Sequence, residues 1–289
     1  MFLYILLLIF GVFCCATSVV FIKLANIEPI TLSSFRLLVA TVFLLPLFIK
    51  EYRVNKEEVT LKDFITPLVP AVMLSLHFIS WIAAARMTPA ANASLIVNLV
   101  PLVMPLLLYI FLKEKINRVE MVATLIALAG VSLLGISDFN VNPEFLKGDI
   151  LCFISMLFLS LYLVLGRKNT GDLWLYMVPL YFYAFCLCFI IALIFEVPFR
   201  AYEIKDILMA IGLGLVPTVI GHTVLNYSMK HLRGQIVSIF TMFQFVFAGV
   251  MGYFLFDEVP TVTFCIVSIL LTISAVVATT DVIVKKKKR

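Results

Sequence analysis

The sequence predicts an all-α integral membrane protein with ten transmembrane helices, arranged as two five-helix inverted-topology repeats. Three observations support this fold class. Of the 289 residues, 63% are hydrophobic and 13% are charged, whereas soluble domains are about half apolar and a quarter charged. The apolar residues form ten segments, each near the roughly 20 residues that span a bilayer. The second five segments repeat the pattern of the first five about 145 residues later.

The ten segments follow one another with short polar connections. The first has no Lys or Arg before its apolar run and no A-x-A cleavage site, so it is interpreted as a helix, not a signal peptide. Because each repeat has an odd number of crossings, the second enters the membrane in the opposite sense. Two domains are expected, residues 1–143 and residues 144–289, the second with a basic tail. The expected helices cover residues 2–22, 30–49, 64–85, 90–112, 119–137, 148–165, 174–195, 206–229, 235–256 and 260–283.

The loop charges predict an orientation. Ten crossings put both termini on one side, and most of the 22 Lys and Arg residues fall in loops on that side. Short cytoplasmic loops are enriched in Lys and Arg, so we expect a multi-pass protein of the cytoplasmic (plasma) membrane with both termini in the cytoplasm. The basic residues of the terminal side are Lys50, Arg53, Lys56, Lys62, Lys113, Lys115, Arg118, Arg167, Lys168, Lys230, Arg233 and those of 285–289; those of the opposite side are Lys23, Arg86, Lys147, Arg200 and Lys205.

Several function classes are not expected. All six cysteines fall in apolar segments without a C-x-x-C pair, so they are interpreted as packing residues. The polar stretch 51–63 is too short for a soluble catalytic domain, and no Walker-type glycine loop is present. An intramembrane enzyme would need a nucleophile or paired acidic residues deep in the membrane, and the apolar segments of this sequence show neither. We therefore expect no enzymatic activity, cofactor, metal or nucleic-acid partner; the expected partners are lipid and a small-molecule substrate, and the oligomeric state, monomer included, stays open.

The internal repeat is clearest across the third to fifth segments of each half. HFISWIAAARMTPAANASLIVNLV, which begins at His77, aligns with HTVLNYSMKHLRGQIVSIFTMFQF, which begins at His222, an offset of 145. The offset is 144 at Glu114 and Glu258, which implies a one-residue gap between two helices. Matched helix lengths and matched polar positions rarely arise independently, so the halves are interpreted as a duplication.

Several stretches carry a family resemblance along nearly the whole chain. They are FIKLANIEPITLSSFRLLVA (21–40), GDILCFISMLFLSLYLVLGRK (148–168) and the paired repeat endings LKEKI and FDEVP. Together and in this order they resemble the EamA-type family of the drug/metabolite transporter (DMT) superfamily. The chain departs from that family in FGVFCCATS, which lacks a Trp-Gly pair, and at Phe245, the equivalent of Pro101 in the second repeat.

The resemblance implies a secondary transporter that moves small organic metabolites by alternating access. It favours export (efflux) of amino acids or related compounds. The alternative is an importer or facilitator of a polar or cationic metabolite. A purely structural scaffold would not need polar groups in register at depth in both repeats.

Two histidines are candidate site residues. His77 and Trp81 share one helix face, as do His222 and Asn226. One interpretation has each histidine neutral and bonded to a neighbouring helix, where it stabilises the bundle. The other has them lining a central cavity, where they bind substrate or exchange a proton near neutral pH.

A polar stripe on the fourth helix adds further candidates. Ser94, Asn98, Pro101 and Pro105 lie on one face, and the prolines free carbonyl groups that need partners in a bilayer. A polar cavity with Asn98 would supply those partners, and a kink satisfied by Ser or Thr is the alternative. Gln244 adds an amide to the ninth helix, so we expect these two helices to face each other across the cavity.

Arg36 and Tyr162 complete the candidate substrate-binding set. Arg36 lies inside the second helix, where snorkelling to the interface would explain it. Alternatively, it supplies a fixed positive charge that favours substrates with a carboxylate. Tyr162 could stack on apolar parts of a substrate, although embedded aromatic residues often only pack. The whole candidate set is His77, Trp81, Asn98, His222, Asn226, Gln244, Tyr162 and Arg36.

Overall fold

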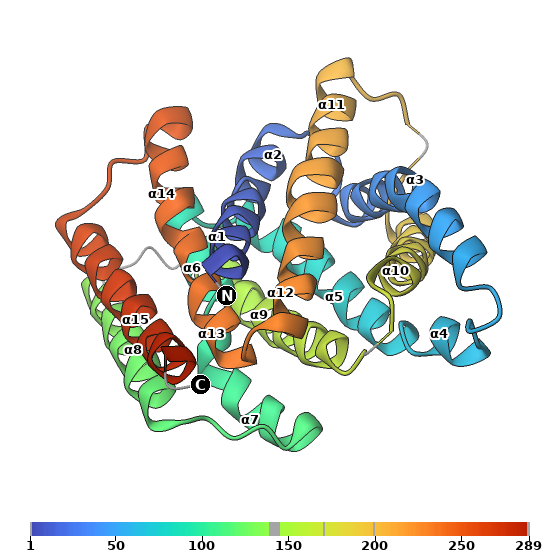
Figure 1. Cartoon of the computed structure of the whole chain (residues 1–289). Coiled ribbons are helices and arrows are strands. Elements are labelled where there is room, and N and C mark those ends of the chain that lie inside the picture. Colours follow the sequence, from blue (N-terminus) through green and yellow to red (C-terminus); the bar gives the residue numbers. More distant parts are fainter. Residues whose placement is uncertain (1, 139–144, 170, 199, 288–289) are drawn as a thin grey trace.

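The computed structural model describes residues 2–138, 145–169, 171–198 and 200–287, and every regular element in these ranges is a helix (Figure 1). The predicted boundary between residues 143 and 144 lies outside them, as do Lys288 and Arg289 of the basic tail. The elements are α1 (Phe2–Ala16), α2 (Ser18–Leu24), α3 (Pro29–Val54), α4 (Leu61–Ile65), α5 (Leu68–Ala85), α6 (Ala90–Val97), α7 (Val100–Leu112), α8 (Arg118–Asp138), α9 (Leu146–Arg167), α10 (Leu173–Phe195), α11 (Ile204–Leu213), η1 (Gly214–His222, a π-helix), α12 (Thr223–His231), α13 (Gly234–Thr241), α14 (Phe243–Phe256) and α15 (Val262–Lys287).

Nine helical stretches among the described residues are long and apolar enough to cross a bilayer. Several consist of consecutive elements: α1 with α2, α4 with α5, α6 with α7, α13 with α14, and α11 with η1 and α12. The other four are α3, α9, α10 and α15. The chain is therefore an all-helical multi-pass membrane protein. α8 lies along α15, and its place as a tenth span stays a prediction.

The described helices pack mainly in pairs that join the first half of the chain to the second. α3 lies along α10, α5 along α9, and α8 along α15. Figure 1 shows α8 and α15 at one edge of the molecule and α3 with α10 at the other. α1 crosses η1 and α12 near the centre, where α6 meets α14. Each pair takes one helix from each half, so neither half buries its apolar faces alone.

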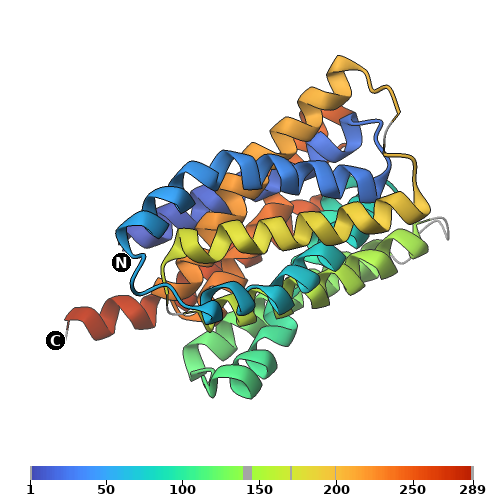
Figure 2. The same cartoon turned by 90° about the vertical axis from the view of Figure 1, so that its right-hand side faces the viewer.

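The two ends of the bundle can be told apart by the chain termini. Figure 2 shows the helices side-on, with both termini at one end, which we call the terminal end. Tyr4, near the start of α1, stacks on His231 at the end of α12, with ring centroids 4.7 Å apart. Lys23 lies at the far end of the span Leu3–Leu24, at the opposite end of the bundle.

Apolar side chains also cover the outside of the bundle. Leu106, Leu125 and Ile194 are each at least 60% exposed, on three different helices. In water such surfaces would drive aggregation, but hydrocarbon solvates them. The polar residues that need partners therefore lie inside the bundle.

Candidate functional site

Two spanning helices are interrupted at matching positions. α6 ends at Val97 and α7 begins at Val100, while α13 ends at Thr241 and α14 begins at Phe243. Asn98 and Met242, at the two breaks, are 144 positions apart. Interrupted helices in corresponding positions of two halves are the usual place of a transporter's substrate site, because their backbone groups face a cavity and not lipid.

The side chains at these breaks bond to each other. Gln244 Nε2 donates to Asn98 Oδ1 at 2.8 Å, and Asn98 Nδ2 donates to the carbonyl of Ser94 at 2.7 Å. The two helices were predicted to face each other across a cavity; in this structure their amides bond directly and also line a small cavity. The carbonyl of Pro101, which Pro105 leaves without its helical donor, accepts from Gln235 Nε2 at 3.3 Å.

The two histidines lie side by side, with ring centroids 6.0 Å apart. His77 Nδ1 is 2.7 Å from Ser155 Oγ and 3.1 Å from the Ser155 carbonyl oxygen, so α9 fixes its ring. His222 Nδ1 is buried and has no hydrogen-bond partner in the part of the chain that the structure describes. Phe78 contacts the His222 ring edge-on at 5.0 Å. The pair thus combines one anchored ring with one that has a free ring nitrogen.

A small cavity of about 20 Å³ lies between these groups. A single water needs about 10–15 Å³ by this measure, so the cavity is too small for an amino acid. Trp81 Nε1 donates to Ser18 Oγ at 3.1 Å on its wall. The structure therefore represents a closed state of the centre. The cavity is lined by Cys15, Ser18, His77, Trp81, Val97, Asn98, Leu159, His222, Leu225 and Gln244.

Arg36 lies beside this centre and does not snorkel. Its side chain is fully buried, and its guanidinium carbon lies 3.6 Å from the Phe78 ring centroid. Nε donates to Thr218 Oγ1 at 3.0 Å. Nη1 and Nη2 are buried and find no hydrogen-bond partner among the described residues. The snorkelling interpretation is wrong because α10 and η1 pack along α3 and enclose this side chain.

The π-helix η1 positions the partner of Arg36. Pro217 has no N–H to bond the Leu213 carbonyl, and the Thr218 hydroxyl donates to that carbonyl instead, at 2.8 Å. The same hydroxyl oxygen accepts from Arg36. The Tyr181 hydroxyl donates to the Thr218 carbonyl at 3.1 Å. A local disturbance of helix geometry therefore holds the guanidinium in place, in line with the frequent use of π-segments at functional sites.

Asn226 and Tyr162 form a second polar contact next to His222. Asn226 Nδ2 donates to the Tyr162 hydroxyl oxygen and, at 2.9 Å, to the His222 carbonyl. Asn226 Oδ1 is buried without a hydrogen-bond partner among the described residues. Gly166 makes room for this side chain, because a Cβ there would lie 2.6 Å from Asn226 Oδ1.

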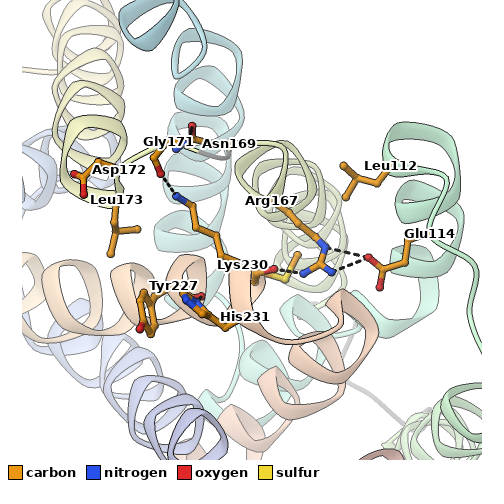
Figure 3. Close-up of a pocket in the computed structure, with 11 residues that line it drawn as sticks. Leu112, Glu114, Arg167, Asn169, Gly171, Asp172, Leu173, Tyr227, Lys230 and His231 are labelled. Carbon is orange, nitrogen blue, oxygen red and sulfur yellow. Dashed lines mark hydrogen bonds and ion pairs between the residues drawn. The ribbon is translucent and has the colours of Figure 1, made fainter. Parts of the chain in front are cut away.

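A larger pocket of about 710 Å³ opens at the terminal end (Figure 3). Arg167 and Glu114 form an ion pair on one side of it, and Lys230 Nζ donates to the Gly171 carbonyl at 2.6 Å on the other. Both charge signs therefore line this vestibule. The lining residues are Leu112, Glu114, Arg167, Asn169, Gly171, Asp172, Leu173, Tyr227, Met229, Lys230 and His231.

The structure brings the predicted site residues into one region, where some line the central cavity and others lie next to it. His77, Trp81, Asn98, His222 and Gln244 line the central cavity. Tyr162 and Asn226 do not line the cavity but contact His222, Tyr162 at its ring and Asn226 at its carbonyl. Arg36 lies over the Phe78 ring, which in turn contacts His222. Sequence reasoning missed Ser155 and Thr218, the partners of His77 and Arg36, and Gln235, which bonds the Pro101 carbonyl. A hydroxyl or amide in an apolar helix is the signal that they share, but it does not say which neighbour they meet.

Comparison with known proteins places the chain in a family. The model of the EamA-like transporter family matches residues 2–136 and again residues 146–280. The chain belongs to the EamA-like transporter family. The predicted membership in the DMT superfamily is therefore confirmed, and the protein is a membrane transporter.

Two similar proteins agree with this family. An uncharacterized transporter of Archaeoglobus fulgidus is 26% identical over 250 residues, which cover 86% of this chain and 85% of that protein. A protein of known crystal structure is 18% identical and superposes with a TM-score of 0.74, over 95% of this chain and 96% of that chain. At 18% identity, this similarity supports only the fold of the EamA-like transporter, not its function.

Proposed function

We propose that this EamA-like transporter exports small organic metabolites that bear a carboxylate, amino acids or related compounds, by alternating access. The observation that carries the proposal is Arg36, a fully buried cation with two terminal nitrogens unpartnered among the described residues. A buried charge whose donors are only partly satisfied is costly, and charged groups inside membrane proteins are typically functional. A substrate carboxylate would supply the missing acceptors.

The chemistry around Arg36 fits a zwitterion. A guanidinium fork binds a carboxylate through two parallel hydrogen bonds. Asn226 Oδ1, which lacks a donor among the described residues, could accept from an ammonium group. The Asn98–Gln244 amide pair and the histidines add neutral donors and acceptors. We propose the whole predicted set, Arg36 included, as the substrate-binding residues.

The closed centre and the terminal vestibule support an alternating mechanism. The central cavity is too small for the substrate, so the broken helices must separate to admit it. The vestibule would receive the substrate at the terminal end. If both termini are cytoplasmic, as the loop charges predict, the vestibule faces the cytoplasm of the plasma membrane, and transport toward the opposite end is export.

The arrangement of the halves supports inverted repeats with domains 1–143 and 144–289. The family model matches once in each half. α1 starts at the terminal end, whereas Arg167, which ends α9, lines the terminal vestibule. The first helices of the two halves thus run in opposite directions. Duplicated halves of opposite sense give the transporter two similar closures, one for each face.

The alternative, an importer or facilitator of a cationic metabolite, has less support, because the fixed charge of Arg36 repels cations from the centre. The test is a panel of metabolites in proteoliposomes, measured for efflux and uptake with and without a pH gradient. The panel includes amino acids and their decarboxylated amines as matched controls. We expect flux of amino acids and about tenfold less flux of the amines. Amine flux equal to or above amino acid flux would refute the proposal.

A further inference from the structure

Two ion pairs recur at equivalent positions of the two halves. Lys23 Nζ lies 2.9 Å from Glu258 Oε1, and Arg167 Nη2 lies 2.8 Å from Glu114 Oε2. Lys23 and Arg167 are 144 positions apart, and so are Glu114 and Glu258. Each pair joins the first half of the chain to the second. All four side chains are at most 26% exposed, which limits solvent screening.

The two pairs lie at opposite ends of the bundle. Arg167 and Glu114 line the terminal vestibule, as Figure 3 shows. Tyr4, at the start of the span Leu3–Leu24, contacts Tyr227 of that vestibule. Lys23 lies at the other end of the same span and therefore at the opposite end of the bundle. The central cavity lies between the two ends, with Cys15 and Ser18 of this same span on its wall. Each pair therefore bridges the halves between the centre and one face.

The same backbone turn presents both glutamates. Lys113 and Asp257, which precede them, have φ angles of 56° and 55° and are the only non-glycine residues with positive φ in the described ranges. Glu114 N–H then bonds the Leu108 carbonyl, and Glu258 N–H the Gly252 carbonyl, both at 3.2 Å. A lysine and an aspartate in this region are uncommon. The repeated turn therefore points to a repeated task for the glutamates.

The two pairs differ in what else the carboxylate holds. Glu258 also accepts from the Ala90 N–H, at 3.0 Å and 3.3 Å to its two oxygens, and so caps the N-terminus of α6. Glu114 Oε1 is buried and has no hydrogen-bond partner among the described residues. Gly234, which begins α13, is the counterpart of Ala90 at the offset of 144. Glu258 therefore bonds both a cation and a helix N-terminus, whereas Glu114 caps no helix among the described residues and lines the vestibule.

We propose that Lys23–Glu258 and Arg167–Glu114 are equivalent gates, and that the carboxylate cap alternates between them during transport. In this structure Glu258 caps α6 and closes the end opposite to the termini. In the other state Glu114 caps α13 at Gly234, and Glu258 releases Ala90. A carboxylate at a helix N-terminus forms a charge-assisted bond and interacts with the helix dipole. Each cap therefore stabilises closure of one half-helix against the opposite half.

The test measures access to the centre from each face and needs no substrate. Cys15 lines the central cavity and is retained as the sole cysteine, with Cys14, Cys152, Cys186, Cys188 and Cys265 replaced by alanine. A membrane-impermeant maleimide is added outside sealed vesicles. Vesicles of one orientation expose the terminal end of the protein to the reagent, and vesicles of the other orientation expose the opposite end. Glu258→Gln and Glu114→Gln form the matched pair, because each keeps the side-chain shape and removes the charge.

We expect opposite results from the two variants. Glu258→Gln should raise Cys15 labelling from the end opposite to the termini about fivefold, which needs only a modest shift of the two-state equilibrium. Glu114→Gln should raise labelling from the terminal end by a similar factor. The exposed carboxylates Glu203 and Glu58, at the two ends, provide controls as Glu203→Gln and Glu58→Gln, which should change neither rate. Equal changes at both faces, or none, would overturn the proposal.

Lys23→Met and Arg167→Met give a second matched pair if a glutamate variant fails to fold. Lys23→Met breaks the ion pair but leaves the Ala90 cap, so it should raise labelling from the same face as Glu258→Gln, but less. Unchanged labelling would contradict the gate. The outcome is independent of the proposed substrate: face-specific labelling without amino acid flux would retain the gates and reject the proposed function, and the converse would reject the gates alone.

Discussion

Arg36 combines a permanent charge, full burial and two terminal nitrogens without partners among the described residues. Its hydrogen bond to Thr218 and its contact with Phe78 hold the side chain, but most of its donors find no acceptor in the part of the chain that the structure describes. Such an arrangement costs folding free energy. Selection for stability alone would have favoured an apolar residue at this position. A functional role and a structural role for Arg36 therefore predict opposite effects of its replacement on stability.

Arg36→Met should stabilise the protein and abolish transport. We expect the free energy of unfolding to rise by about 1–3 kcal/mol, because an incompletely paired buried charge is replaced by a side chain of similar length. Flux of carboxylate substrates should fall about 100-fold. Thermal melting in detergent and proteoliposome flux measure the two effects. A destabilised variant with proportionate loss of flux would instead assign Arg36 a packing role.

Asn98→Leu should impair transport more than folding. The change removes the acceptor of Gln244 and the polar surface at the helix break while keeping similar bulk. We expect about a tenfold loss of flux, which corresponds to one hydrogen bond of about 1 kcal/mol or slightly more. Asn55→Leu, at the end of α3 outside the site, is the matched control and should leave flux unchanged. Equal loss of flux and of folded yield would favour a kink without a binding role.

At the residue scale, the sequence predicted the polar side chains at depth but not their partners. Helical spacing is sufficient to place His77 with Trp81 and His222 with Asn226, because it depends on one helix at a time. Contacts such as His77 with Ser155 depend on which helices pack together. The snorkelling interpretation of Arg36 failed for the same reason, since the helices that cover its side chain lie far away in the sequence.

Individual helices show where local sequence determines geometry. Pro101 and Pro105 predicted a disturbance of the fourth span, and α6 and α7 are separate there. The ninth span is interrupted at Met242, although Phe245 replaces the proline. Repeat symmetry indicates that break, whereas local composition does not. The π-helix η1 was not predicted either, because many helices with proline do not widen in this way.

Gly221→Ala should destabilise the contact of α1 with η1. A Cβ on Gly221 would lie 2.5 Å from Cys15 Sγ and 3.0 Å from the Cys15 backbone nitrogen. The helices must separate to admit it, so we expect a loss of about 1–3 kcal/mol in unfolding free energy. Gly171→Ala is the control, since its nearest neighbour would be Asn169 Oδ1 at 3.4 Å. A melting temperature unchanged by Gly221→Ala would show that the crossing adapts freely.

The whole molecule is held together by pairings between its halves. α3 with α10, α5 with α9 and α8 with α15 each take one helix from either side of the chain. The number and length of the apolar segments predicted an all-helical membrane protein, and the resemblance of its motifs implied this family. The pairing of the halves could not be predicted from composition, because all spans are similarly apolar and any two could pack in lipid.

The loop charges predict the orientation of the molecule. In a variant without native cysteines, Lys115→Cys should react with an impermeant reagent only from the cytoplasm, because the terminal loops carry most Lys and Arg. Val259→Cys, at a position 76% exposed in the turn after α14, should react only from outside. Reaction of the residue-259 cysteine from the cytoplasmic face alone would reverse the orientation and, with it, the proposed direction of transport.

The central claim is that a carboxylate metabolite binds between the halves, at the helix breaks and beside Arg36. The most direct measurement is an experimental structure of the protein with a transported amino acid bound. The account predicts a widened central cavity that holds the ligand, with its carboxylate within hydrogen-bond distance of the Arg36 terminal nitrogens and its remainder near Asn98, His222 and Gln244. A ligand bound elsewhere, with Arg36 still unpartnered, would contradict the claim.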